Sequence, residues 1–276
     1  MKFLEITRKT PRQFLTKTSG FLHGYQYTLN PYIGCSFECF YCYVRRLPVS
    51  LFRKKEWGSW VDIKEVNSMQ FRKELQKAKK KGDVTIFMSS STDPYQPIEV
   101  KEKITRKLLE EMVIEKPDFL FVQTRSPLVT RDIDLFQKLK GHVLVSITIE
   151  TDREDIKKRF SPKAPPIKAR IKVLEKLKEA GIPSQAAVAP VLPYTKDFPY
   201  MLKNVTNRVC IDDFFLGNGA NGVRSKQLKV NTLFMENWFH PEMIQHVYHD
   251  FQKVFHQNEI FISQEGFLPL KRGDEA

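Results

Sequence analysis

Short apolar runs alternate with segments of helical period along most of this chain, and this alternation constrains its fold more than any other feature. The apolar runs lie at residues 84–89, 119–124, 143–149, 184–192 and 209–217, and the helical segments at residues 71–82, 101–116, 131–140 and 165–181. Strands that are apolar along their whole length and are joined by helices are typical of a parallel sheet covered by those helices. The pattern therefore predicts an α/β fold.

A further strand within residues 24–32 brings the count to about six β/α units, fewer than the eight of a closed TIM barrel. We therefore expect an α/β, partial, open (β/α)6 TIM-like barrel. In such folds the chemistry lies at the carboxyl ends of the strands. The expected organisation is an N-terminal extension over residues 1–24, the partial barrel over residues 25–217, and a C-terminal hairpin and helical extension over residues 218–276, packed on the barrel.

Composition limits the class of protein and its partners. A chain of 276 residues that is 41% hydrophobic can bury a full core. It holds no run of about 18 apolar residues and begins without the apolar region of a signal peptide, so we expect a cytoplasmic protein with no membrane partner. A formal net charge of +13 favours a polyanionic partner, above all nucleic acid, over a merely soluble basic protein.

Three of the four cysteines, Cys35, Cys39 and Cys42, fall within eight residues as C-x3-C-x2-C. In a reducing compartment such a cluster indicates a metal or iron–sulfur site rather than disulfides. Three thiolates can bind three irons of a [4Fe–4S] cube and leave the fourth iron open. Zinc is the alternative, but a structural zinc site needs four ligands, and the fourth would be Cys210 or a histidine distant in sequence.

With an aromatic residue, Tyr41, before the last cysteine, the triplet resembles the signature of the radical S-adenosylmethionine (radical SAM) superfamily. The resemblance implies that the open iron is chelated by the amino and carboxylate groups of S-adenosylmethionine. Reductive cleavage of that cofactor then yields a 5′-deoxyadenosyl radical, which abstracts hydrogen. It also implies an electron donor such as flavodoxin or ferredoxin.

Five ordered phrases between about residues 25 and 217 resemble one branch of that superfamily, the spore photoproduct lyase-like or DNA repair photolyase group. They are LNPYIGCSFECFYCYVR, SSSTDPYQPIE, TRSPLVTRDIDL, VSITIETD and KLKEAGIPSQAAVAPVLP. The branch implies an enzyme that uses the adenosyl radical, without light, on a UV-induced pyrimidine (thymine) dimer-type lesion in DNA. The alternatives are a radical SAM enzyme that modifies RNA or protein, and a non-catalytic, metal-holding protein that binds nucleic acid.

The resemblance assigns roles position by position. The cluster ligands match Cys35, Cys39 and Cys42; the adenine-flanking aromatic matches Tyr41; the radical-relay tyrosine matches Tyr43; and the cofactor contacts match Thr92 and Asp93 (amino or ribose side), Arg125 (carboxylate), and Ser146, Thr148 and Glu150 (ribose). These chemical types suit the roles, because an arginine fork binds a carboxylate in bidentate fashion and ribose hydroxyls require polar partners.

One position departs from the branch. Spore photoproduct lyase has a cysteine near the end of the second strand that returns a hydrogen atom to the product radical, whereas this chain has Ser90 there. A serine O–H bond is too strong to donate a hydrogen atom readily. We therefore expect the donor to be Tyr43, Cys210 or 5′-deoxyadenosine, or the lesion to differ. Cys210 is otherwise a small buried hydrophobic residue.

Two basic segments are candidate nucleic-acid contacts, although each is also consistent with an ordinary solvated loop. The first, residues 45–60, mixes cations with aromatic residues: Arg45, Arg46, Arg53, Lys54 and Lys55 with Trp57 and Trp60. Cations beside stacking aromatics suit a distorted or flipped nucleotide. The second, residues 221–231, is predicted to be a turn or hairpin that carries Arg224, Lys226 and Lys229.

Overall fold

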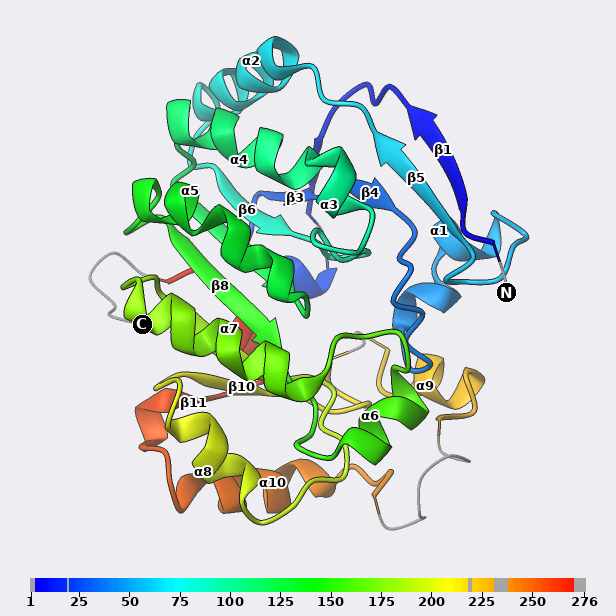
Figure 1. The fold of residues 1–276 in the computed structure, drawn as a ribbon, viewed down its shortest axis with the longest axis vertical. Coiled ribbons are helices and arrows are strands. Elements are labelled where there is room, and N and C mark those ends of the chain that lie inside the picture. Colours follow the sequence, from blue (N-terminus) through cyan, green and yellow to red (C-terminus); the bar gives the residue numbers. More distant parts are fainter. Residues whose placement is uncertain (1–2, 19, 218–219, 231–237, 271–276) are drawn as a thin grey trace.

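The computed structural model describes residues 3–18, 20–217, 220–230 and 238–270. Its main sheet has eight strands in the order β11-β10-β9-β8-β7-β6-β3-β2 (Figure 1). Their bounds are β2 (Leu15–Lys17), β3 (Tyr27–Leu29), β6 (Thr85–Met88), β7 (Phe119–Thr124), β8 (Val143–Thr148), β9 (Ser184–Val188), β10 (Val209–Ile211) and β11 (Ile260–Ile262). All neighbours pair in parallel except β2 with β3. The predicted partial, open barrel is confirmed, with β3 and β6 to β10 as its six expected strands.

Helices connect the parallel strands, and Figure 1 shows α4, α5 and α7 along the outside of the sheet. The longer helices are α2 (Ser68–Lys79), α4 (Ile104–Ile114), α5 (Ile133–Lys138), α6 (Glu154–Phe160), α7 (Ile167–Glu179), α8 (Phe198–Lys203) and α10 (Met243–Gln252), and the short ones are α1 (Pro48–Leu51), α3 (Glu99–Glu102) and α9 (Val223–Gln227). Within the described residues, none of these helices has both the length and the apolarity that a bilayer crossing requires.

Two secondary-structure predictions, one of a helix and one of a turn or hairpin, need correction. The helix expected over residues 101–116 is divided into α3 and α4, because Lys103 between them has a left-handed backbone with φ of 53°. Of the turn or hairpin expected over residues 221–231, the described residues form the turn, and the hairpin alternative is wrong for them. There the chain turns at Gly222, whose φ is 78°, and then forms α9; residue 231 lies outside the described residues.

Segments at both ends of the chain add strands that the sequence analysis did not include. Strand β1 (Glu5–Lys9) pairs in parallel with β5 (Trp60–Lys64), which pairs with β4 (Tyr32–Ile33) in a separate three-stranded sheet. Strand β2 belongs to the predicted N-terminal extension and β11 to the predicted C-terminal extension, yet both extend the main sheet. The boundaries at residues 24 and 217 stay predictions.

Period-two alternation along the strands separates two cores, since successive side chains point to opposite faces. Ile86 and Val122 belong to the large cluster between the sheet and the outer helices. Phe87, Phe121 and Leu144 form a second cluster that is separate from it. Because these strands run in parallel, the residues that follow their carboxyl ends lie at one end of the barrel, where the site described next is found.

Candidate active site

The loop between β4 and the 3₁₀ helix η2 (Tyr43–Arg46) carries the three clustered cysteines. Cys35 and Cys39 are buried, and Cys42 is partly exposed. The loop starts at Gly34, where φ is 87° and a Cβ atom would lie 2.6 Å from the backbone oxygen of Trp60. Only glycine suits both this backbone conformation and this close approach, so Gly34 fixes the entry into the loop.

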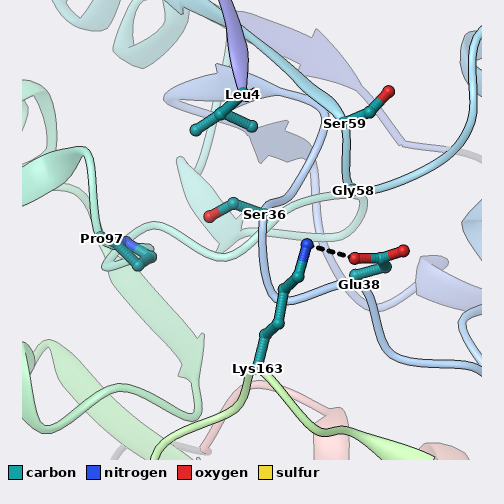
Figure 2. Close-up of a pocket in the computed structure, with 7 residues that line it drawn as sticks. All are labelled: Leu4, Ser36, Glu38, Gly58, Ser59, Pro97 and Lys163. Atoms are coloured by element: carbon teal, nitrogen blue, oxygen red, sulfur yellow. Dashed lines mark ion pairs between the residues drawn. The ribbon is translucent and has the colours of Figure 1, made fainter. Parts of the chain in front are cut away.

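Several contacts hold the outer side of this cysteine loop. Arg45 donates from Nε to the carbonyl oxygen of Cys39 and from Nη2 to that of Glu38, each at 3.0 Å. A small pocket of about 250 Å³ lies beside the loop. Figure 2 shows the residues that line it, with the ion pair between Lys163 and the Glu38 carboxylate. The fork of Arg45, predicted to contact nucleic acid, is thus engaged in bracing the loop.

The inner side of the cysteine loop faces a cavity of about 630 Å³, within the range of about 300–1,000 Å³ typical of small-molecule sites. All three clustered cysteines line it, together with polar residues beyond the strand ends. The predicted site residues in its wall are Cys35, Cys39, Tyr41, Cys42, Tyr43, Thr92, Asp93, Arg125 and Thr148, along with Trp57 and Arg224. The fold therefore brings most of the predicted cofactor residues together.

The donor set of the loop fits an iron–sulfur cluster. Three free thiols from one short loop line the same cavity, and three is the number of protein ligands that a cube with one open iron takes. Burial raises the pKa of the Cys42 thiol to about 11, and it also raises the pKa values of the Cys35 and Cys39 thiols. The metal must therefore displace three protons as it binds, because thiolates are the ligands.

Asp93 lies behind the end of β6, where it accepts three hydrogen bonds. Its donors are the hydroxyl of Thr124 at 2.7 Å and the backbone N–H groups of Tyr95 at 2.9 Å and Arg125 at 3.0 Å. Burial raises the pKa of Asp93, and these hydrogen bonds oppose that shift. The carboxyl is therefore fixed in orientation at the cavity wall.

Glu150 joins two arginines below the cavity wall. Its Oε1 lies 2.6 Å from Nη1 of Arg125, and its Oε2 lies 2.5 Å from Nη1 of the fully buried Arg170. The hydroxyl of Tyr41 also donates to Oε1. Burial alone would raise the pKa of Glu150, but the charges of Arg170 and Arg125 hold it at about 2. With both oxygens engaged, Glu150 positions Arg125 and Tyr41, and it is not among the described residues that line the cavity.

The two predicted ribose contacts on β8 differ in position. Thr148 lines the cavity, and its Oγ1 accepts a hydrogen bond of 2.6 Å from Gln123 Nε2. Ser146 lies two residues deeper and accepts a hydrogen bond of 3.0 Å from Gln185. Since Ser146 is not among the described lining residues, its predicted cofactor contact has no support from the geometry.

The two candidate hydrogen-atom donors in the protein, Tyr43 and Cys210, differ in their position relative to the cavity. The hydroxyl of Tyr43 donates to the backbone carbonyl of Ser90, and both residues line the cavity. Cys210, on β10, is fully buried; its thiol is 3.5 Å from the carbonyl of Ser263, and it is not among the described lining residues. The structure therefore places Tyr43 beside the cysteine loop and Cys210 away from it.

Many of the predicted nucleic-acid residues make contacts within the protein. Arg53 lies 2.9 Å from Asp62, Arg46 donates to the carbonyl of Gln227, Lys55 pairs with Glu5, and Trp57 packs edge-to-face against Trp60. Trp57 and Trp60 are both buried. Arg224 on α9 lines the cavity, and Lys226 lies on the same helix. The nucleic-acid contacts of these residues, and of Lys54 and Lys229, stay predictions.

Among the polar residues of this region that sequence reasoning missed are Arg170, Gln123 and Asp212. Arg170 is hidden in the periodic pattern of α7, where it occupies a buried position. Gln123 and Asp212 both line the cavity. Their positions on or just after the apolar strands β7 and β10 were the available signal, because a polar residue in an apolar run at the carboxyl end of a barrel strand faces the site.

Residues 29–207 match the radical SAM superfamily. An uncharacterized protein of Methanocaldococcus jannaschii is 37% identical over 179 residues, which are 65% of each chain. An uncharacterized protein of Acidianus two-tailed virus is 36% identical over 177 residues, 62% of this chain and 57% of the viral one. The chain thus covers less than two thirds of the length of both relatives.

Among solved structures, a point mutant of spore photoproduct lyase superposes with a TM-score of 0.68 at 13% identity, covering 93% of this chain and 81% of the lyase. A double mutant of that lyase, with bound AdoMet and dinucleoside spore photoproduct, gives a TM-score of 0.64 at 14% identity with the same coverage. These likenesses show the fold. The superfamily match confirms the predicted cofactors, a [4Fe–4S] cluster and S-adenosylmethionine.

Proposed function

Because this chain belongs to the radical SAM superfamily, we propose that it is a radical SAM lyase that repairs a UV-induced, thymine dimer-type lesion in DNA without light. The likeness of fold to spore photoproduct lyase over 93% of the chain supports this proposal. The curated relatives are uncharacterized and carry no argument about the substrate.

The observation that carries the proposal is the position of Tyr43. Its phenol lines the same cavity as the neighbouring Cys42, and its hydroxyl is oriented by the carbonyl of Ser90. A tyrosine at this place can pass a hydrogen atom between the cofactor and a substrate radical in the same cavity. A protein that only holds a metal has no need of such a residue.

The proposed binding of the cofactors follows the cavity wall. Cys35, Cys39 and Cys42 would hold the cluster, and Asp93 would receive the amino group of S-adenosylmethionine. Both side-chain hydrogen bonds of Arg125 within the described residues are made by Nη1, which leaves its Nη2 and Nε edge for the cofactor carboxylate. Thr148 would contact the ribose.

When bound, the cluster and S-adenosylmethionine supply a carbon-centred adenosyl radical that removes one hydrogen atom from the lesion. The bond that joins the two thymines then breaks homolytically and leaves a radical on one of them. Tyr43 would return one hydrogen atom to that radical, so the number of hydrogen atoms in the two thymines is conserved. The phenoxyl radical left on Tyr43 would then take up one electron from the proposed electron donor and one proton. The buried walls around Tyr43 would exclude water and other hydrogen donors.

The proposed partners are UV-damaged DNA and an acidic electron donor such as flavodoxin or ferredoxin. The formal charge of +13 favours both by electrostatic attraction. Arg224 is the cation best placed to meet a DNA phosphate at the site, since it lies in the cavity wall on α9.

The test is anaerobic reconstitution of the protein, followed by reductant, S-adenosylmethionine and UV-irradiated DNA. We expect 5′-deoxyadenosine to form while one thymine photoproduct disappears. The variant with Cys35, Cys39 and Cys42 all changed to alanine should lose both activities. Formation of 5′-deoxyadenosine with no loss of any photoproduct, but with modification of added RNA or protein, would contradict the proposed substrate.

A further inference from the structure

A polar layer crosses the interior of the barrel just above its aromatic core. The strand register pairs Phe87 with Phe121 and Met88 with Val122, so Ser89 and Gln123 are the next residue on each side of the last paired position. The same register pairs Gln123 with Ser146, and Ser146 with Gln185. Gln123, Ser146 and Gln185 therefore lie at one level on three neighbouring strands and, by period-two alternation, on the face that Phe121 occupies. Ser89 completes the layer from the residue directly after β6, and it lines the same cavity as Gln123.

Half of this layer is satisfied by the protein itself. Ser146 accepts a hydrogen bond of 3.0 Å from Gln185 Nε2, and Gln185 Oε1 accepts one of 2.9 Å from Arg208. Neither Ser146 nor Gln185 is among the described residues that line the cavity. This side of the layer is a closed structural network.

The other half of the layer has unused hydrogen-bonding capacity. Ser89 Oγ and Gln123 Oε1 are buried, and neither has a hydrogen-bond partner within the described part of the chain. Ser89 is only 6% exposed. Both residues line the cavity. Buried polar groups are rarely left unpaired, because each costs about 1–3 kcal/mol. The two unpaired oxygens thus belong to residues that a cavity ligand can contact.

Contacts within the protein fix the positions of Ser89 and Gln123 but leave Ser89 Oγ and Gln123 Oε1 without hydrogen bonds in the described part of the chain. The Ser89 backbone has φ of 80°, a left-handed conformation unusual for serine, and its N–H donates to the carbonyl of Leu29 at 2.8 Å. Gln123 Nε2 is held by Thr148 Oγ1 at 2.6 Å, so its Oε1 remains as an acceptor. The pair presents one hydroxyl, which can donate, beside one carbonyl oxygen, which can only accept.

An aromatic surface lies next to this pair. Phe87 stacks on Phe121 with ring centroids 4.9 Å apart and an angle of 14°, and it meets Phe267 edge-on. Phe87 and Phe267 both line the cavity. A flat ring with apolar faces fits such a surface, while its polar edge would meet Ser89 and Gln123.

We propose that Ser89 and Gln123 determine substrate specificity by reading the N–H and C=O edge of a pyrimidine base, with Phe87 and Phe267 against its face. Gln123 Oε1 accepts from the base N3–H, and Ser89 Oγ donates to the adjacent carbonyl oxygen. Neighbouring strands lie about 4.8 Å apart, so both side chains can reach one edge of a six-membered ring. This inference rests on the proposed repair function and assigns its base-reading residues.

The test compares two purified ligands, a thymine–thymine photoproduct dinucleotide and its N3-methyl counterpart, which lacks the N–H group. Binding is measured on the protein loaded with cluster and S-adenosylmethionine and kept without reductant, so that no turnover occurs. We expect the unmethylated ligand to bind about ten- to a hundredfold more tightly, since methylation leaves a buried acceptor unpaired.

The variants separate the two contacts. Gln123→Leu should bind both ligands with nearly equal affinity, whereas Ser89→Ala should weaken both ligands by the same factor, because its carbonyl partner is present in each. Gln123→Glu retains an acceptor oxygen and should still bind the unmethylated dinucleotide more tightly than the methylated one. This variant keeps the test decisive if Gln123→Leu fails to fold. Ser184→Ala, next to Gln185 but on the opposite face of β9, is the control and should match the parent protein.

Three results would overturn the assignment. The first is equal affinity of the parent protein for the two ligands, and the second is an unchanged preference in Gln123→Leu. The third is loss of S-adenosylmethionine binding, rather than dinucleotide binding, in the Ser89 and Gln123 variants. In each case the proposed repair function survives if the parent protein removes photoproducts from irradiated DNA. Failure of the parent protein to bind either dinucleotide would count against both proposals.

Discussion

Arg125 Nη1 lies 2.6 Å from Glu150 Oε1, so the cation in the cavity wall is tied to a carboxylate buried behind it. Glu150 is in turn held by Arg170, which is fully buried. Breaking a buried ion pair by removing one partner is costly, because the remaining charges lose their compensation. The orientation of Arg125 therefore depends on residues that do not touch the cavity.

Glu150→Gln should lower the free energy of unfolding by about 3–5 kcal/mol, since it leaves the fully buried guanidinium of Arg170 and the partly buried one of Arg125 without a counter-charge. Denaturant titration measures this change. Glu110→Gln is the matched control, because Glu110 pairs with Arg106 at 3.2 Å but its side chain is 49% exposed, so its loss should cost less than about 1 kcal/mol. Equal effects of the two substitutions would contradict the proposed positioning network.

The raised pKa of Asp212 should make the free energy of unfolding depend on pH. Burial, followed by the nearby charge of Asp213, raises the pKa of Asp212 to about 7 from an ordinary value of 3.8. The folded state therefore binds more protons than the unfolded state between these values, and this stabilisation is lost as pH rises through 7. Asp212→Asn does not titrate, so its stability relative to the parent chain should increase by about 3 kcal/mol from pH 5 to pH 8. Parallel stability curves for the two proteins would refute this prediction.

Tyr43→Phe should uncouple radical formation from repair. The ring remains in place while the hydroxyl that donates to Ser90 is lost, which costs about 1 kcal/mol of stability. We expect 5′-deoxyadenosine to form still, with fewer repaired thymines per molecule of it, as quantified by chromatography of the digested DNA. Tyr200→Phe, which alters an exposed tyrosine, should keep the parent ratio. An unchanged ratio in Tyr43→Phe would exclude Tyr43 as the hydrogen donor.

Arg45→Ala should reduce the iron and sulfide bound per chain after reconstitution. Arg45 makes two hydrogen bonds of 3.0 Å to carbonyls of the cysteine loop, and their loss frees the loop that carries the ligands. Arg45→Lys should fall between the parent protein and Arg45→Ala, because an ammonium group cannot fork across two carbonyls. Arg153→Ala, which removes an exposed ion pair with Asp155, is the control. Full iron content in Arg45→Ala would show that the brace is dispensable.

The parallel core of the fold could be predicted because its strands are apolar along their length and its helices are periodic. Strand β1 could not, because four of its five residues are exposed and its sequence, EITRK, reads as polar. Strand β11 has only three residues, and it joins the sheet by pairing with β10, about fifty residues earlier, a contact that no local pattern reports.

The site shows the same division between local and spatial information. The cysteine loop could be predicted because its ligands are contiguous in sequence. Ser146 and Thr148 have the same residue chemistry and the same strand parity, and only their depth in the barrel separates a satisfied interior hydroxyl from a lining one. Likewise, a run of positive charge in residues 45–60 does not reveal which cations are already paired, as Arg53 is with Asp62.

Deuterium transfer tests the central claim most directly. A thymine photoproduct deuterated at the saturated ring carbon next to the carbon that carries the bond between the two bases is given to the anaerobically reduced, cluster-loaded protein with S-adenosylmethionine. The account predicts that deuterium appears in 5′-deoxyadenosine as the photoproduct reverts to thymines. Repair without deuterium in 5′-deoxyadenosine, or 5′-deoxyadenosine without deuterium or repair, would contradict it.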